Sequence, residues 1–268
     1  MRLKDLYIYP VKSLGGIKQS EGKVLERGFE YDRRWMLVDD AGKSITQRVE
    51  HKLALLRTEV IADKIRVFNK DIPDQSIILE PAGEDLLNVS VWDDSTKALQ
   101  TGEEINTWFS TYLGKSCKLV FMPETGKRLV DPRYAEHNEQ VSFADAFPYL
   151  LISQSSLDDL NGRLSQSVPM NRFRPNLVVS GTNAFEEDTW AKIKIGDVYF
   201  KVAKPCARCI LTTVDQETGL KGKEPLFTLS SYRTKDNKVL FGQNLIALNK
   251  GIIRENDLVE VISYKQLG

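Results

Sequence analysis

The sequence predicts a mainly β, α+β fold with few helices. Short runs of β-branched and aromatic residues recur between turn residues, which favours many short strands and a β-barrel. Only two segments show a clear helical period. The chain has 268 residues, so it has room for one large domain or two intimate ones. At this size roughly 70–75% of the surface of the unfolded chain can be buried without disulfide bonds.

The first half of the chain begins with strands. Residues 3–9 form a β-rich run that stops at Pro10. Residues 34–39 and 44–47 flank Asp40-Ala41-Gly42-Lys43, a pattern that predicts a hairpin. Further strands are predicted over residues 56–62, 65–68, 76–79 and 117–121.

Two helices follow from apolar spacing. Ile105, Trp108, Phe109, Tyr112 and Leu113 recur at the i, i+3, i+4, i+7, i+8 positions of a helix, and Gly114 stands where the C′ residue belongs. The leucines at positions 157, 160 and 164 repeat in the same way after Ser155-Ser156, which we take as the N-cap region.

Strands return after residue 164. They are predicted over residues 176–180, in a hairpin over 193–200 around Gly196-Asp197, and over 209–214 and 258–264. A turn-rich and then polar stretch near residues 122–140 indicates a soft boundary. We therefore expect an N-terminal β-rich domain over residues 1–122 and a second domain over residues 123–268.

Charge and cysteine content limit the classes of function. Lys plus Arg and Asp plus Glu balance at 37 each, which predicts neither a nucleic-acid partner nor a membrane-surface partner. Three cysteines are too few for a secreted disulfide scaffold. The N-terminus lacks the pattern of a secretory signal, and no apolar run approaches a membrane span. We expect a cytoplasmic protein.

The most informative stretch is Lys204-Pro205-Cys206-Ala207-Arg208-Cys209-Ile210-Leu211-Thr212-Thr213-Val214-Asp215. Its Cys-x-x-Cys leaves several interpretations open. Structural zinc needs a second Cys/His pair. A thioredoxin-like pair would begin a helix, whereas the residues after Cys209 favour a strand. The two thiols can also be plain buried side chains, or one thiolate can bind a soft transition-metal centre.

Basic residues supply candidate anion-binding groups. On an extended segment Arg172 and Arg174 would share one face, and two guanidinium groups on one face suit a phosphate or a carboxylate. Lys12 and Ser13 precede two glycines in a turn that could donate to a phosphate, although its spacing is not that of a Walker A motif. Taken alone, each segment is better explained by surface arginines or by an ordinary turn.

Together the segments resemble a known family. Tyr-Pro-Val-Lys-Ser at 9–13, Asp-Arg-Arg-Trp at 32–35, Asn-Arg-Phe-Arg-Pro-Asn at 171–176, the cysteine segment at 206–215 and Leu-Phe-Gly-Gln-Asn at 240–244 occur in the order seen in MOSC-domain proteins. The chain resembles the mitochondrial amidoxime-reducing components and their bacterial relatives from about residue 2 to residue 265. The resemblance implies a MOSC β-barrel packed against a β-rich N-terminal MOSC subdomain.

The resemblance also implies a site for the molybdenum cofactor (molybdopterin with its metal). It assigns the metal ligand to Cys209 and places Asp145 near the metal as a proton donor or water anchor. It implies that Lys12, Ser13 and Arg33 hold the terminal phosphate of the cofactor. Contacts to pterin or phosphate then fall to Arg174 and Asn176, with Asn244 lining the pocket. Phe147 stands where relatives can carry a hydroxyl residue, so a hydrogen bond from that position is not expected.

The implied reaction is the two-electron reduction of an N–O bond in N-hydroxylated small molecules. A separate electron donor is implied, either a ferredoxin, a flavodoxin or a haem protein, because the sequence lacks the cysteine run of a plant-type ferredoxin. Since MOSC domains also occur in molybdenum cofactor sulfurases, the alternative is a cofactor carrier or sulfur-transfer module without its own redox turnover. We expect no bound pyridoxal phosphate in either case.

Overall fold

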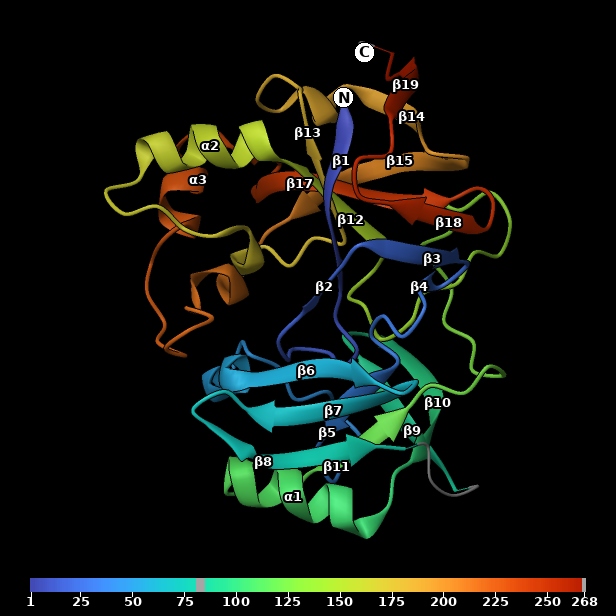
Figure 1. Cartoon of the computed structure of the whole chain (residues 1–268), viewed down its shortest axis with the longest axis vertical. Helices are drawn as coiled ribbons and strands as arrows, with labels where there is room; N and C mark the ends of the chain where they lie inside the picture. The colour runs from blue at the N-terminus through green and yellow to red at the C-terminus, as the bar shows by residue number, and fades with distance from the viewer. Residues whose placement is uncertain (81–84, 267–268) are drawn as a thin grey trace.

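The computed structural model describes residues 1–80 and 85–266 and shows two β-rich lobes, one above the other in Figure 1. The large lobe contains most strands of the second half of the chain, and the small lobe contains the strands between residues 35 and 121. Three α-helices occur in these described ranges, and strands dominate. The prediction of a mainly β, α+β fold is confirmed.

The large lobe is built on a nine-stranded sheet in the order β19-β14-β15-β17-β12-β13-β1-β2, with β16 paired to β17. A second sheet, β18-β3-β4, lies beside it. The strands are β1 (Arg2–Ile8), β2 (Ile17–Gln19), β3 (Glu21–Leu25), β4 (Gly28–Phe29), β12 (Tyr149–Ser153), β13 (Leu177–Ser180), β14 (Trp190–Ile195), β15 (Val198–Ala207), β16 (Thr234–Lys235), β17 (Lys238–Ala247), β18 (Gly251–Arg254) and β19 (Val259–Tyr264).

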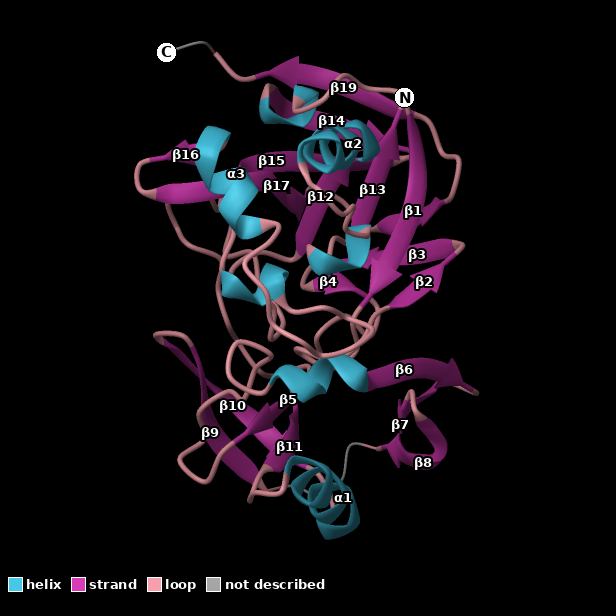
Figure 2. Cartoon of the chain, turned by 90° about the vertical axis from the view of Figure 1, so that its left-hand side faces the viewer, coloured by secondary structure: helices cyan, strands magenta, loops and turns pink. Residues whose placement is uncertain are grey.

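The small lobe contains a four-stranded sheet, β5-β11-β10-β9, and a three-stranded sheet, β6-β7-β8. Helix α1 covers one side of this lobe (Figures 1 and 2). The strands are β5 (Trp35–Val38), β6 (Leu56–Ile61), β7 (Lys64–Asn69), β8 (Ile72–Leu79), β9 (Leu86–Val91), β10 (Asp94–Gln100) and β11 (Lys118–Phe121).

Strand pairing connects the two ends of the chain. The first strand, β1, pairs with β13 from Arg2–Ser180 to Leu6–Leu177, and β3 pairs with β18. Strands from the first 30 residues thus complete the sheets of the large lobe. The division of the chain at residue 122 stays a prediction. Strands that precede this position pair with strands that follow it.

Local capping residues determine one end of α1 and one end of α2. Helix α1 (Glu103–Leu113) ends at Gly114, whose φ of 67° is left-handed, as the sequence predicts. Helix α2 (Gln154–Arg163) begins earlier than expected. Its N-cap is Ser153, whose hydroxyl accepts a hydrogen bond from the Ser156 amide, rather than Ser155 or Ser156. The shorter α3 (Leu226–Tyr232) packs near β17.

The predicted strands over 3–9, 56–62, 65–68, 76–79, 117–121, 176–180 and 258–264 are confirmed within one to four residues, and the hairpin predicted over 193–200 is confirmed at its turn, although its second strand continues to Ala207. The predicted strand over 44–47 is wrong. Ser44 forms only an isolated bridge with Val38, because the chain then turns at Thr46, whose carbonyl accepts hydrogen bonds from the amides of Val49 and Glu50.

The turn after β1 joins the two lobes. Val11 and Leu14 are fully buried in the core of the small lobe, whereas Leu3 and Leu6 on β1 are buried in the core of the large lobe. Burial at both ends holds Lys12 and Ser13 at the junction of the two cores. This junction is where the candidate site lies.

Candidate functional site

A pocket of about 240 Å³ lies between the turn after β1 and segments of the large lobe. Residues from both halves of the sequence line it. Every predicted site residue is among them: Lys12, Ser13, Arg33, Asp145, Arg174, Asn176, Cys209 and Asn244. The fold therefore brings together positions up to 232 residues apart in the sequence, from 12 to 244.

Cys209 sits at the wall of this pocket and is partly exposed. The predicted strand over residues 209–214 is wrong: Cys209 is the N-cap of a 3₁₀ helix, η4 (Ile210–Thr213). The hydroxyl of Thr212 donates to the Cys209 carbonyl at 3.0 Å, and that of Thr213 donates to the Ile210 carbonyl at 2.7 Å. Such local hydroxyl–carbonyl bonds compete with strand pairing, and here they turn the chain at Cys209.

The second thiol of the motif lies in the same pocket but on β15. Cys206 Sγ accepts a hydrogen bond from the Arg208 guanidinium at 3.0 Å. The same guanidinium donates to the Phe173 carbonyl at 2.6 Å. Arg208 thus fixes Cys206 beside the segment that carries Arg174, so two sulfur atoms in different local environments line one pocket.

Two arginines enclose one aromatic ring at the pocket wall. The guanidinium groups of Arg33 and Arg174 lie 4.2 and 4.3 Å from the centroid of the Tyr9 ring. Arg33 is neutralised by the buried Asp32, whose carboxylate oxygens lie 2.8 and 2.7 Å from it. Among the described residues no carboxylate forms an ion pair with Arg174, and burial lowers its pKa to about 10.

One Arg174 nitrogen lacks a hydrogen-bond partner within the described part of the chain. Its Nη2 atom is buried and has no hydrogen-bond partner in residues 1–80 and 85–266. A buried donor without a partner is costly, and this one belongs to a residue that lines the pocket. An anionic group in the pocket would satisfy it.

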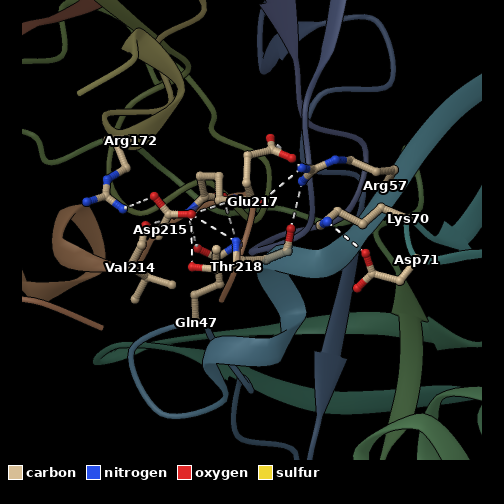
Figure 3. A network of polar contacts seen from close by, with 11 residues as sticks. Gln47, Arg57, Lys70, Asp71, Arg172, Val214, Asp215, Glu217 and Thr218 are labelled. Atoms are coloured by element: carbon tan, nitrogen blue, oxygen red, sulfur yellow. Dashed lines mark hydrogen bonds and ion pairs between the residues drawn. The ribbon is translucent and has the colours of Figure 1, made fainter. Parts of the chain in front are cut away.

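Arg172 and Arg174 do not form the predicted pair on one face. The segment is not extended: Arg172 ends a 3₁₀ turn, η2 (Met170–Arg172), and Arg174 has a φ of 56°. Arg172 instead forms an ion pair with Asp215 at 3.3 Å, outside the residues that line the pocket (Figure 3). The left-handed backbone at Arg174 turns that side chain the other way, toward Tyr9.

An ion pair crosses another part of the pocket. Lys12 Nζ contacts Asp145 Oδ1 at 2.6 Å and donates to the Phe143 carbonyl at 2.8 Å. Burial, the largest single influence, would raise the pKa of Asp145, but the charge and hydrogen bond of Lys12 together with Arg48 and Trp92 outweigh it and hold that pKa well below its usual range. Burial lowers the pKa of Lys12, against the opposing charge of Asp145. The carboxylate of the pair is therefore ionised at neutral pH.

Sequence reasoning missed three residues around Asp145. Trp92 Nε1 donates to Asp145 Oδ1 at 3.2 Å, and Arg48 stacks 4.0 Å from the Trp92 ring centroid. Arg128 is buried and donates to the carbonyls of Ser142, Ala144 and Asp145. Arg48 and Trp92 come from segments far from residue 145, and Arg128 lies 17 residues before it, so no local pattern could identify them.

The two predicted asparagines are partly engaged in the scaffold. Asn176 Nδ2 donates to the Tyr7 carbonyl at 3.1 Å, and its Oδ1 accepts from the Leu150 amide at 3.3 Å. Asn244 Nδ2 lies 3.4 Å from the Pro205 carbonyl. Asn176 therefore fixes the register of β1 and β12 at the pocket, in addition to lining it.

The residues present fit an anionic ligand that carries a soft metal. The described lining residues include six cations (Lys12, Arg33, Arg48, Arg174, Lys204 and Arg208), and among these lining residues Asp145 supplies the only carboxylate. Arg groups recognise phosphates well. A cysteine thiolate is a donor that soft metals prefer. No group of three His, Cys, Asp or Glu side chains able to hold a metal by themselves occurs in the described part of the chain.

Comparison with known proteins identifies both halves of the chain. Residues 138–260 match the family model of the MOSC domain, and residues 1–116 match that of the MOSC N-terminal beta barrel domain. The chain is 36% identical over 276 residues to the mitochondrial amidoxime-reducing component 1 of Mus musculus, covering 96% of this chain and 81% of that protein.

Two further relatives differ in length. The mitochondrial amidoxime reducing component 2 of Rattus norvegicus is 36% identical over 279 residues, covering 96% of this chain and 82% of that protein. The molybdenum cofactor sulfurase of Oryza sativa subsp. japonica is 34% identical over 278 residues, and this chain spans 33% of its length. None of the helices in residues 1–80 and 85–266 has the length and apolar character of a membrane span, and the cytoplasmic location stays a prediction.

Proposed function

The chain belongs to the MOSC-domain family that includes the mitochondrial amidoxime-reducing components, and from that premise we propose that it binds the molybdenum cofactor and reduces N-hydroxylated compounds. The observation that carries the proposal is the position of Cys209. Its thiol lines a pocket with six cationic side chains and a single carboxylate among the described lining residues.

In this proposal Cys209 is the protein ligand of the metal. Arg174 offers its unpartnered Nη2 to the anionic part of the cofactor, together with Ser13, Arg33 and the third donor of Lys12. Asn176 and Asn244 complete the wall. When bound, the cofactor supplies the two-electron redox chemistry.

Reduction of an amidoxime consumes two electrons and two protons and releases an amidine and one water. The lowered pKa of Asp145 leaves its carboxylate without a proton to donate at neutral pH. We assign Asp145 the role of accepting a hydrogen bond from the substrate, and Lys12 Nζ the role of holding the proton of the pair. The half-exposed carboxylate of Asp145 leaves one oxygen within reach of a small molecule.

The electrons come from a separate protein in this proposal, as the relatives' family suggests. A ferredoxin, a flavodoxin or a haem protein would serve. Substrates are small N-hydroxylated molecules such as amidoximes, hydroxylamines or N-hydroxylated bases.

The test is reduction of a model amidoxime by purified protein with a chemical electron donor, alongside molybdenum and pterin content per chain. We expect Cys209→Ser to lose at least 99% of the turnover, whereas Cys117→Ser, at a buried thiol outside the pocket, keeps it. Cys206→Ser tests whether the other thiol of the motif is needed for amidoxime turnover. Turnover of Cys209→Ser near that of the wild type would exclude the ligand assignment.

A carrier or sulfur-transfer module is the second candidate, because the rice molybdenum cofactor sulfurase matches 96% of this chain. Such a module would bind the cofactor through the same pocket. Tight cofactor binding without amidoxime turnover, in protein with a full molybdenum load, would favour it.

A further inference from the structure

A pair of buried glutamine side chains connects the two sides of the pocket. Gln47 is fully buried and Gln216 is 4% exposed. Gln47 Nε2 donates to Gln216 Oε1 at 3.3 Å, and Gln216 Nε2 donates back to Gln47 Oε1 at 3.0 Å. The two amides therefore form a reciprocal pair, although they stand 169 residues apart.

Each amide also donates a hydrogen bond to a backbone carbonyl in a segment beside the pocket. Gln47 Nε2 donates to the Ser13 carbonyl at 2.7 Å, in the turn that carries Lys12. Gln216 Nε2 donates to the Val214 carbonyl at 3.0 Å, and Val214 is the C-cap of η4, the helix that begins at Cys209. All four N–H donors of the two amides are thus used, and each amide oxygen accepts one hydrogen bond.

A second set of hydrogen bonds holds the turn that contains Gln216. The Arg57 guanidinium donates to the Gln216 carbonyl at 2.8 Å and to Glu217 at 2.7 Å. Asp215, in the same turn, accepts hydrogen bonds from the amides of Glu217 and Thr218 and pairs with Arg172. Figure 3 shows the turn at Asp215–Thr218 between Arg172 on one side and Arg57 on the other, with Gln47 beside it.

We propose that the Gln47–Gln216 bridge is a positioning device that fixes the Ser13 turn relative to Cys209. This inference rests on the proposed function for its biological meaning, because those two segments would hold the anionic end and the metal end of one ligand. The Ser13 turn lies at the junction of the two lobes, and Cys209 follows β15 of the large lobe. A shift of either segment would change the span between Ser13 and Cys209. Gln47 and Gln216 line no part of the pocket and act through the backbone that they hold.

The test uses Gln47→Met, Gln216→Met and the double variant in the full chain. Methionine keeps the length of the side chain and removes the amide. Each single variant leaves one buried amide without its partner, so we expect it to unfold at a lower temperature than the double variant. We expect the double variant to melt below the wild type, because the Ser13 and Val214 carbonyls lose these donors, and to release pterin about tenfold faster.

A second readout does not depend on the cofactor. In cofactor-free protein, the rate at which iodoacetamide alkylates Cys209, followed by peptide mass spectrometry, should rise at least about threefold in the double variant. The matched control is Asn106→Leu, which removes a buried amide that links Thr101 to β11 in the small lobe. The control should melt earlier without changing the reactivity of Cys209.

Wild-type alkylation and release rates in the double variant would overturn the positioning role. A change in Asn106→Leu equal to that in the double variant would also overturn it, since general loosening would then explain both. Absence of molybdenum and pterin from the wild type would defeat the proposed function alone, because the alkylation rate of Cys209 would still decide whether the bridge positions it.

Discussion

At the scale of single residues, Arg174 shows a conflict between stability and binding. Its guanidinium is buried against Tyr9, one nitrogen lacks a partner in the described ranges, and its φ of 56° is uncommon for a residue with a side chain. Such features cost stability unless a ligand compensates them. The burial and the left-handed backbone of Arg174 are therefore better explained by ligand binding than by a contribution to the stability of the fold.

Replacing Arg174 with methionine tests this conflict. We expect Arg174→Met to weaken cofactor retention roughly tenfold or more, because a charge-assisted hydrogen bond contributes about 1.5–3 kcal/mol. The cofactor-free variant should melt at the wild-type temperature or above it, since a partly unsatisfied buried cation is removed. Scanning calorimetry and pterin assays measure the two effects, and a strongly destabilised cofactor-free variant would contradict the argument.

The Lys12–Asp145 pair predicts a pH dependence of stability. The pKa of Asp145 in the folded protein lies below its value in the unfolded chain. Its contribution is therefore complete above about pH 4, the unfolded carboxyl pKa, and is lost as the pH falls below it. We expect Asp145→Asn to cost about 1 kcal/mol at pH 7, because the carboxylate is half exposed. Urea unfolding should show a smaller difference between variant and wild type at pH 3.

Sequence reasoning located the site residues that stand in distinctive motifs and missed those that act across the fold. Cys209 and Arg174 occur in segments whose residue types suggest their chemistry. Arg48, Trp92 and Gln47 reach the site region only because three-dimensional packing brings their segments to it. Their sequence neighbourhoods carry no sign of that contact.

At the scale of elements, local hydrogen bonding overrides strand propensity where the site is built. Ile210, Leu211 and the two threonines favour a strand by composition, but the threonine hydroxyls bond to carbonyls three residues earlier and form η4. The segment at Arg172–Arg174 departs from an extended conformation in a similar way. Regular elements such as α1 and β6 follow their apolar periodicity, whereas the segments beside the pocket do not.

The N-cap of α2 offers a test with a matched control. Ser153 Oγ accepts from the Ser156 amide at 3.1 Å and donates to the buried Glu187 at 2.9 Å. Ser153→Ala should therefore lower the free energy of unfolding by about 1–2 kcal/mol. Ser155→Ala, at one of the two positions that the sequence suggested, should cost less than about 0.5 kcal/mol. Equal losses in chemical denaturation would reject Ser153 as the cap.

At the scale of the whole molecule, the pocket depends on how the two lobes sit together. Val11 and Leu14 are buried in the small lobe, while β1 just before them belongs to the large sheet. The sequence predicts both strand-rich halves, but not that β1 and β3 pair with strands from the second half. Such pairing is set by distant segments, which a single sequence does not relate to one another.

A ligand that contacts both lobes should stabilise the whole chain. A group bound only by the folded state adds about 2.7 kcal/mol at a hundredfold excess over its dissociation constant, which corresponds to roughly 5–10 °C for a chain of this size. Removal of the cofactor should therefore lower the melting temperature by about that amount. In Cys209→Ala/Arg174→Met, which lacks contacts from two separate segments, the loaded and unloaded proteins should melt together. Because the Ser13 turn joins the two lobes and Cys209 follows β15 of the large lobe, an unchanged melting temperature on removal of the cofactor from the wild type would mean that the ligand does not bridge these two segments.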